Sequence, residues 1–281
     1  SGVRAMVAFG GHVTGFQFIN YFARNADNAM LGYAWGAGPL GLYTRAYSLM
    51  MMPPQRLNFP MTGVAVPALS RVSEDRERFR RIYRQMLSAL ALAATPVMVL
   101  MLLIAGELFR VLLSEEWVDA IPIFMLLGPG AIMWATNVAP SWLYLSLGHV
   151  HRMNRFAIIN SAVMLFAFAI GLQYGPQGMA IAASSVAVVM KVPGFAYAAH
   201  GTPVRIRDLF DCITFPTLAS LIAAGLAWLI AGQIPIGGDL VTAAIKVVIY
   251  VAALAMALIW TPWGRANLAA VRSLASKLRS K

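Results

Sequence analysis

The chain contains 281 residues, of which 59% are hydrophobic and 12% are charged. An average soluble domain has roughly a quarter of its residues charged, so this composition argues against a water-soluble fold. The formal charge of +11 excludes an acidic protein, and the single cysteine excludes an internal disulfide.

Long stretches without charge recur along the chain. The longest, from Phe156 to Met190, contains 35 residues, and Ala120 to Gly148 contains 29. A helix needs about 20 apolar residues to cross the hydrocarbon core, where it satisfies its own backbone donors. We therefore predict an all-α, polytopic transmembrane helix bundle with about eight spans. In chain order the spans are Met6 to Tyr33, Leu40 to Leu69, Ile82 to Leu103, Ala120 to Leu147, Met153 to Gln173, Gln177 to Ala199, Phe210 to Ala231 and Leu240 to Trp260.

The charges of the connecting segments predict how the spans are oriented. If both ends of the chain are cytoplasmic, the inward connections and the two ends hold 16 of the 22 Lys and Arg residues. The outward connections hold one cation, Arg110, and five acids. This alternation is the positive-inside pattern of membrane insertion. We therefore attribute most of the positive charge to topology and expect no nucleic-acid binding.

The first predicted span carries a polar stripe. Polar residues follow one another at spacings of three or four, which places them on one face of a helix. Ionisable groups at membrane depth usually face a bundle interior or a wet cavity rather than lipid. The stripe therefore predicts a face turned toward neighbouring helices. It consists of Thr14, Gln17, Tyr21, Arg24 and either Asp27 or Asn28.

The second predicted span repeats this polar pattern. Arg45, Ser48, Gln55 and Thr62 are spaced by three or seven residues, so they share one face. Arg56 lies 11 residues after Arg45, which returns nearly to the same azimuth about 16 Å along the axis. The four prolines of this span predict a bent or broken helix, because each removes a helical hydrogen bond. They are Pro53, Pro54, Pro60 and Pro67.

These arginines suggest a cationic cavity for an anion, because guanidinium groups match phosphate oxygens in pairs and stay charged. Pairing of Arg24 with Asp27 and anchoring of Arg45 at the outer interface are the alternatives. Asp27 either compensates the charge of Arg24 or binds a coupling proton or cation. Two further cations within the spans, Lys191 and Lys246, are expected to reach an interface or to pair.

The residues of the first two spans and the loop after them resemble the bacterial polysaccharide flippases. These belong to the multidrug, oligosaccharidyl-lipid and polysaccharide exporter superfamily. The resemblance covers residues 20 to 117 and weakens beyond them. It rests on Asn20 to Asn28, Leu31-Gly32, Gly36 to Tyr43, Arg45-Ala46-Tyr47, Pro54, Pro67 to Arg71, Asp75 to Arg80 and Glu116-Trp117.

The resemblance implies a protein of two six-helix lobes around a central cavity, usually with two additional helices. This chain would be the second lobe and the two additional helices, with the N-terminal lobe as its missing partner. We expect residues 1–201 to form the six-helix lobe and residues 202–262 the two additional helices. Residues 263–281 would form a basic amphipathic tail on the inner leaflet.

The resemblance also implies a substrate. It would be an undecaprenyl-diphosphate-linked oligosaccharide, moved across the bacterial inner membrane for lipopolysaccharide, capsule or exopolysaccharide assembly, with a polysaccharide polymerase as a further partner. Arg24, Arg45 and Arg56 suit the diphosphate. The side chains suited to the glycan are Gln17, Asn20, Tyr21, Asn28 and Gln55.

Other functions remain as alternatives. A membrane glycosyltransferase or polymerase acting on the same lipid carrier often needs a sizeable outer loop, whereas the longest outward connection here has about 16 residues. A structural assembly partner and another exporter of the superfamily are the other two. The sequence contains no glycine-rich nucleotide loop, nucleophile elbow or zinc motif, so we expect a transporter that is not an enzyme and holds no cofactor or metal.

Overall fold

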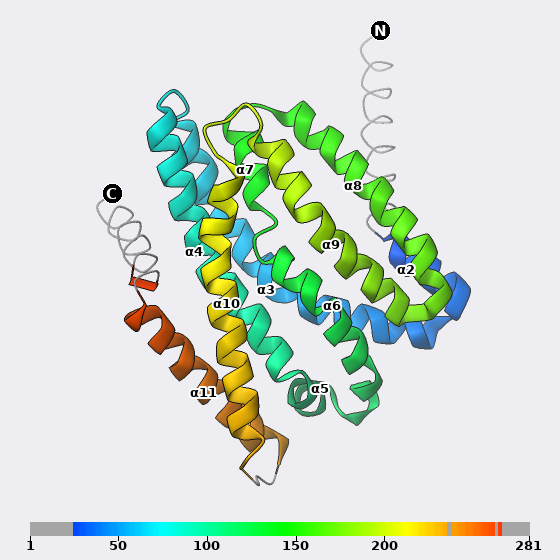
Figure 1. The fold of residues 1–281 in the computed structure, drawn as a ribbon. Helices are drawn as coiled ribbons and strands as arrows, with labels where there is room; N and C mark the ends of the chain where they lie inside the picture. Colours follow the sequence, from blue (N-terminus) through cyan, green and yellow to red (C-terminus); the bar gives the residue numbers. More distant parts are fainter. Residues whose placement is uncertain (1–24, 235–237, 262–263, 266–281) are drawn as a thin grey trace, which may run out of the picture.

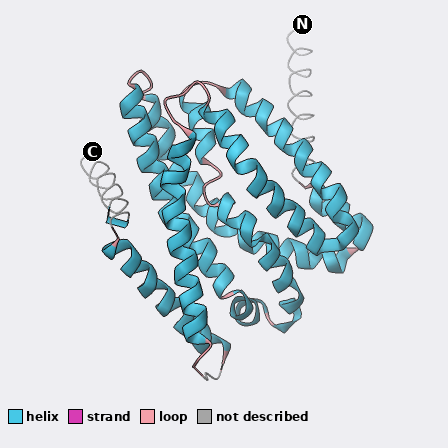
Figure 2. Cartoon of the chain, in the orientation of Figure 1, coloured by secondary structure: helices cyan, strands magenta, loops and turns pink. Residues whose placement is uncertain are grey.

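The structure is a computed structural model, and it describes residues 25–234, 238–261 and 264–265. Within these ranges the fold is an all-α bundle, as predicted (Figures 1 and 2). The helices are α2 (Ala26–Trp35), α3 (Ala37–Ser70), α4 (Arg76–Leu103), α5 (Ala105–Leu113), η1 (Glu115–Ala120), α6 (Ile121–Trp134), α7 (Ala139–Ser146), α8 (Val150–Gly171), η2 (Leu172–Tyr174), α9 (Gly175–Ala199), α10 (Ile206–Ala231) and α11 (Asp239–Trp260).

Five described segments are long and apolar enough to cross a bilayer, and one of them contains both α8 and α9. Together they account for the six predicted spans from the third onward. The first span lies mostly within residues 1–24, outside the described residues. The second is α3, which is long enough but is not one of the five segments. The five are Arg76–Leu103, Glu115–Ser146, Val150–Ala199, Ile206–Ala231 and Asp239–Trp260.

Helix α3 corrects one prediction. It is a single helix of 34 residues with all four prolines inside it, so of the two predicted outcomes, a bend or a break, the break is wrong. A proline removes one hydrogen bond, whereas the neighbouring turns keep theirs, and the packing of one face can hold the helix together. That packed face carries Tyr43, Met50, Ala65 and Leu69, all of which are completely buried.

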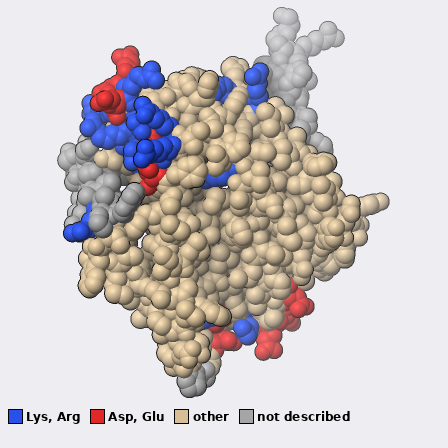
Figure 3. All heavy atoms as spheres, viewed as in Figure 1, with Lys and Arg blue, Asp and Glu red and all other residues tan. Residues whose placement is uncertain are grey.

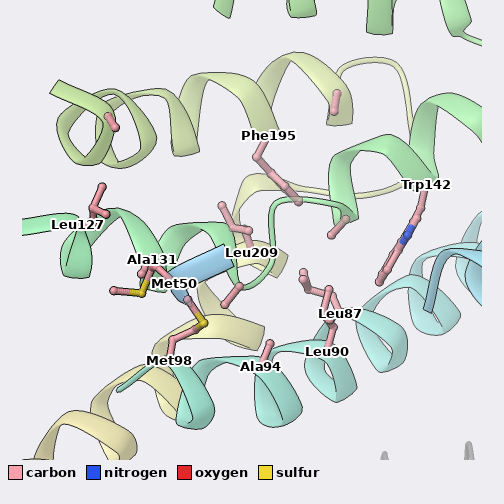
Figure 4. Close-up of a cluster of buried hydrophobic side chains, with 14 of the residues drawn as sticks. Met50, Leu87, Leu90, Ala94, Met98, Leu127, Ala131, Trp142, Phe195 and Leu209 are labelled. Carbon is pink, nitrogen blue, oxygen red and sulfur yellow. The ribbon is translucent and has the colours of Figure 1, made fainter. Parts of the chain in front are cut away.

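Side chains from most of the bundle meet in one apolar core. Met50 of α3, Leu87 of α4 and Leu127 of α6 converge there with side chains from α7, α9 and α10 (Figure 4). Helix α10 therefore packs against the preceding helices through its first turns, which contribute Leu209. A second, smaller cluster joins α4, α10 and α11, where the hydroxyl of Tyr250 donates to the carbonyl of Pro96 at 2.9 Å.

Large apolar side chains also cover much of the outer surface. Phe166 on α8 and Trp228 on α10 are 70% and 63% exposed. Such a surface is unfavourable in water and suits contact with lipid. Charged groups gather toward two opposite ends of the molecule, with a broad, almost uncharged band between them (Figure 3). The chain is thus a multi-pass membrane protein.

The two ends differ in their ion pairs. At one end, where α4 and α10 begin, Arg80 donates two hydrogen bonds of 2.8 Å to the fully buried carboxylate of Asp208. Arg84 adds ion pairs to Asp208 at 3.2 Å and to Asp211 at 3.3 Å. At the other end, Lys246 of α11 forms a 2.5 Å ion pair with Glu107 of α5. Both additional helices are therefore fixed to the rest of the bundle by charge as well as by apolar contact.

Candidate functional site

The predicted polar stripe of the first two spans falls partly outside the described residues. Gln17, Asn20, Tyr21 and Arg24 lie within residues 1–24, so the proposed pairing of Arg24 with Asp27 lies there too. The other five candidates are described. They are Asp27, Asn28, Arg45, Gln55 and Arg56.

Asp27 is a buried carboxylate at the start of α2, with 7% of its surface exposed. Its Oδ2 accepts a hydrogen bond of 3.1 Å from the hydroxyl of Tyr43 on α3. Its Oδ1 has no hydrogen-bond partner among the described residues. Asn28, the next residue, is half-buried. A buried carboxylate with one unoccupied oxygen can accept a proton or help to coordinate a cation.

Aromatic rings continue from Asp27 toward the end of α6. Tyr43 stacks on Tyr47 with ring centroids 5.9 Å apart, and Tyr47 meets the edge of Trp134 at 5.8 Å. The sequence interpretation missed this row. Its signal is the spacing of four between the two tyrosines, which places them on one face of α3.

Arg45 is exposed, and its guanidinium carbon lies 4.7 Å from the centroid of the Trp117 ring. Trp117 belongs to η1, at the end of the molecule where Glu107 and Asp239 also lie. A guanidinium over a tryptophan face gains roughly 0.5 to 2 kcal/mol, depending on its exposure to water. The contact ties α3 to η1 and leaves the hydrogen-bond donors of Arg45 without a partner among the described residues.

Gln55 and Arg56 lie further along α3, and both are exposed. Neither makes an ion pair or hydrogen bond with a residue that the structure describes. Their side of the helix also carries Met52 and Phe59, which are 54% and 86% exposed. This face combines a guanidinium, an amide and large apolar groups. It can bind an amphiphile that has an anionic group and hydroxyls.

Comparison with known proteins gives the same family as the sequence patterns. The family described as polysaccharide biosynthesis protein matches residues 1–122. The chain is similar to the lipopolysaccharide biosynthesis protein WzxC of Escherichia coli K12, with 26% identity over 165 residues, which cover 59% of this chain and 34% of that protein. It is also similar to the teichuronic acid biosynthesis protein TuaB of Bacillus subtilis 168, with 25% identity over 126 residues, which cover 45% and 26%.

Among solved structures, the chain resembles the lipid II flippase MurJ in its inward closed conformation. The TM-score is 0.66 at 18% identity, and the match covers 84% of this chain and 50% of that one. The family match over residues 1–122 and the fold shared with MurJ agree with the resemblance to the polysaccharide flippases that the sequence indicated. The matched part of the chain spans half of MurJ and about a third of WzxC.

Proposed function

We propose that the chain forms the second lobe, with two additional helices, of a transporter that flips undecaprenyl-diphosphate-linked oligosaccharide across the bacterial inner membrane. The relatives are named for lipopolysaccharide and teichuronic acid biosynthesis and for lipid II flipping, which supports a lipid-linked glycan as the cargo. The N-terminal lobe would supply the opposite wall of the cavity, and both ends of this chain would be cytoplasmic, in agreement with the positive-inside pattern. Residues 1–201, 202–262 and 263–281 would be the lobe, the additional helices and a tail on the inner leaflet.

The observation that carries this proposal is the exposed face of α3. Arg56 and Gln55 are exposed within a helix of 34 residues whose other face is packed in the core. A guanidinium that no described residue pairs is expensive at membrane depth, unless it faces water or an anion. The diphosphate would pair with Arg56, and with Arg24 and Arg45 when the cavity narrows. Hydroxyls of the glycan would bond to the amide of Gln55 and to Gln17, Asn20, Tyr21 and Asn28.

Transport would proceed by alternating access, in which the two lobes rock around the bound diphosphate. Asp27 would then couple transport to a proton or cation, because its Oδ1 has no partner among the described residues. The hydrogen bond from Tyr43 to Asp27 and the aromatic row beyond it link this group to α3, the helix that carries Arg56.

Replacing Arg56 with alanine tests the proposal. Export of the glycan should fall by at least about tenfold in cells that carry the variant at normal membrane abundance, because a hydrogen bond to a charged group contributes about 1.5 to 3 kcal/mol. Arg81→Ala is the matched control, since Arg81 is also an exposed arginine and lies near the start of α4. Export that is unchanged in Arg56→Ala, or equally reduced in the control, would remove Arg56 from the site.

A further inference from the structure

A second polar site lies where the fourth predicted span is interrupted. Helix α6 ends at Trp134 and α7 begins at Ala139, with turns between them. Pro140 in the first turn of α7 has no backbone N–H, and the carbonyl of Thr136 accepts instead from the N–H of Ala139 at 3.3 Å. The N–H of Asn137 donates to the carbonyl of Trp134 at 3.1 Å, so the carbonyl of Met133 loses its helical donor. Unpaired carbonyls are costly within a membrane, so the interruption needs donors from elsewhere.

Lys191 of α9 supplies them. Its Nζ donates to the carbonyl of Met133 and to the hydroxyl of Thr136, each at 2.8 Å. Lys191 lies eight residues before the end of α9 at Ala199, which is about 12 Å along the helix axis. The ammonium is therefore well inside the span, and one of its three N–H groups remains after these two bonds.

The charge of Lys191 is not balanced as the charges of Lys246 and Arg45 are. Lys246 pairs with Glu107, and Arg45 lies on the ring of Trp117. Lys191 instead contacts only a neutral carbonyl and a neutral hydroxyl. Ionised groups at this depth are normally paired with an opposite charge or face water.

A cavity of about 210 Å³ adjoins the ammonium, between α7, α8 and α9. Among the described residues its polar lining consists of Trp134, Asn137, Ser141, Tyr144, Asn160 and Lys191, and none of them is a carboxylate. The amides of Asn137 and Asn160 have no hydrogen-bond partner among the described residues. Tyr144 is 3% exposed, and its hydroxyl is also without a partner there. The cavity thus combines one uncompensated cation with several unused donors.

We propose that this cavity binds a phosphate group, with the ammonium of Lys191 as its counter-charge and the amides of Asn137 and Asn160 as hydrogen-bond donors. The volume is below the 300 Å³ or more that drug-sized ligands occupy, so the bound group is small. Met153, Phe156 and Met164 form an apolar wall beside it, which suits a phosphate attached to a hydrocarbon. The phosphate is either free inorganic phosphate or the headgroup of a polyprenyl lipid, and only the second source rests on the proposed function.

Binding to the purified protein in lipid nanodiscs tests this site with three probes: inorganic phosphate, undecaprenyl phosphate and the uncharged alcohol undecaprenol. At a ligand concentration of 100 times Kd, the melting temperature should rise by about 5 °C. The rise should occur with undecaprenyl phosphate and be absent with undecaprenol. A rise with inorganic phosphate as well would make free phosphate a ligand, and a rise with the lipid alone would assign the site to the lipid-linked group.

Four variants locate the site. Lys191→Met should weaken binding at least about tenfold, because it removes the one charge in the described lining, whereas Lys191→Arg should retain most of the binding. Asn160→Leu should weaken phosphate binding several-fold. If Lys191→Met does not fold, Asn160→Leu shows whether the phosphate binds in this cavity. Arg155→Met is the control, since it removes an exposed cation that lies outside the cavity on α8, the helix that carries Asn160.

The proposal is overturned if neither phosphate binds, if undecaprenol binds as well as its phosphate, or if Lys191→Met and Asn160→Leu bind as tightly as the unmodified protein. The Arg56→Ala variant separates the two sites, because it should lose export while its phosphate binding at Lys191 is unchanged. A protein that binds phosphate at Lys191 yet shows no flipping would refute the transport proposal and leave this one standing.

Discussion

Replacing Asp208 with alanine should release the start of α10 from α4. The carboxylate of Asp208 is fully buried and accepts two hydrogen bonds from Arg80 and one from the backbone N–H of Arg205, each at 2.8 Å. Arg84 contributes a further ion pair at 3.2 Å. The side chain therefore both caps α10 and compensates two guanidinium groups.

The free energy lost can be worked out from these contacts. Removing one partner of a fully buried ion pair costs about 3 to 5 kcal/mol. Here the side chains of Arg80 and Arg84 are 30% and 41% exposed, so water can solvate them once the carboxylate is gone. Loss of the helix cap adds about 1 kcal/mol. We therefore expect about 2 to 3 kcal/mol for the opening of this junction.

The only cysteine of the chain reports on the junction. Cys212 is 2% exposed, and its Sγ lies 3.6 Å from the carbonyl oxygen of Arg84. Modification by N-ethylmaleimide requires local opening, so its rate follows the opening equilibrium. A loss of 2 to 3 kcal/mol corresponds to modification roughly 30 to 150 times faster.

Asp211→Ala is the matched control. Asp211 makes one ion pair of 3.3 Å with Arg84, and its side chain is 31% exposed. An ion pair of this kind contributes about 0.2 to 1 kcal/mol, so modification of Cys212 should accelerate by no more than about fivefold. Equal rates in Asp208→Ala and Asp211→Ala, or no acceleration in either, would refute the reasoning.

Further substitutions at three positions, one of them with a compensating change, test the packing of the bundle. Lys246→Met should lower the melting temperature by about 6 to 12 °C, because it leaves Glu107 unpaired with its side chain 9% exposed. Adding Glu107→Gln should restore most of the lost melting temperature. No recovery in the double variant would contradict this account. Gly130→Ala should destabilise by about 1 to 3 kcal/mol in the same melting assay, because a Cβ there would lie 2.7 Å from the Cα of Ser184 on α9. Gly225→Ala in α10, where a Cβ would meet nothing within 4 Å, should stabilise by about 0.5 to 1 kcal/mol, and a shift of the same sign in both alanine variants would contradict the packing argument.

The long apolar helices could be predicted from sequence because hydropathy reports what a bilayer selects. The charge-free run from Phe156 to Met190 correctly predicted α8 and α9, with a turn near Gly175, where φ is +66° and glycine is favoured. Helix boundaries were predicted less well. Helix α4 begins at Arg76 rather than Ile82, because Asp75 caps it outside the apolar region and a helix continues where lipid ends.

Contacts between distant residues could not be predicted in the same way. Lys246 and Glu107 are 139 residues apart, and Lys191 reaches a carbonyl 58 residues away. A single sequence indicates that such cations need partners at membrane depth, but the partner depends on how the helices cross. The interruption between α6 and α7 was missed for a related reason, since the run from Ala120 to Leu147 carries no charge. The substrate-binding roles of Arg24, Arg45 and Arg56 remain predictions.

The two ion-pair junctions lie at opposite ends of the additional helices. Arg80 and Asp208 join α10 to α4 at one surface of the bilayer, and Lys246 and Glu107 join α11 to α5 at the other. Each of the two helices is therefore fixed at one surface, and neither can rotate or slide independently of the bundle without breaking a charge pair. In the proposed alternating access, α10 and α11 would therefore tilt together with the helices to which they are joined, so that a spectroscopic probe on the exposed side of α11 would follow the motion of the whole bundle.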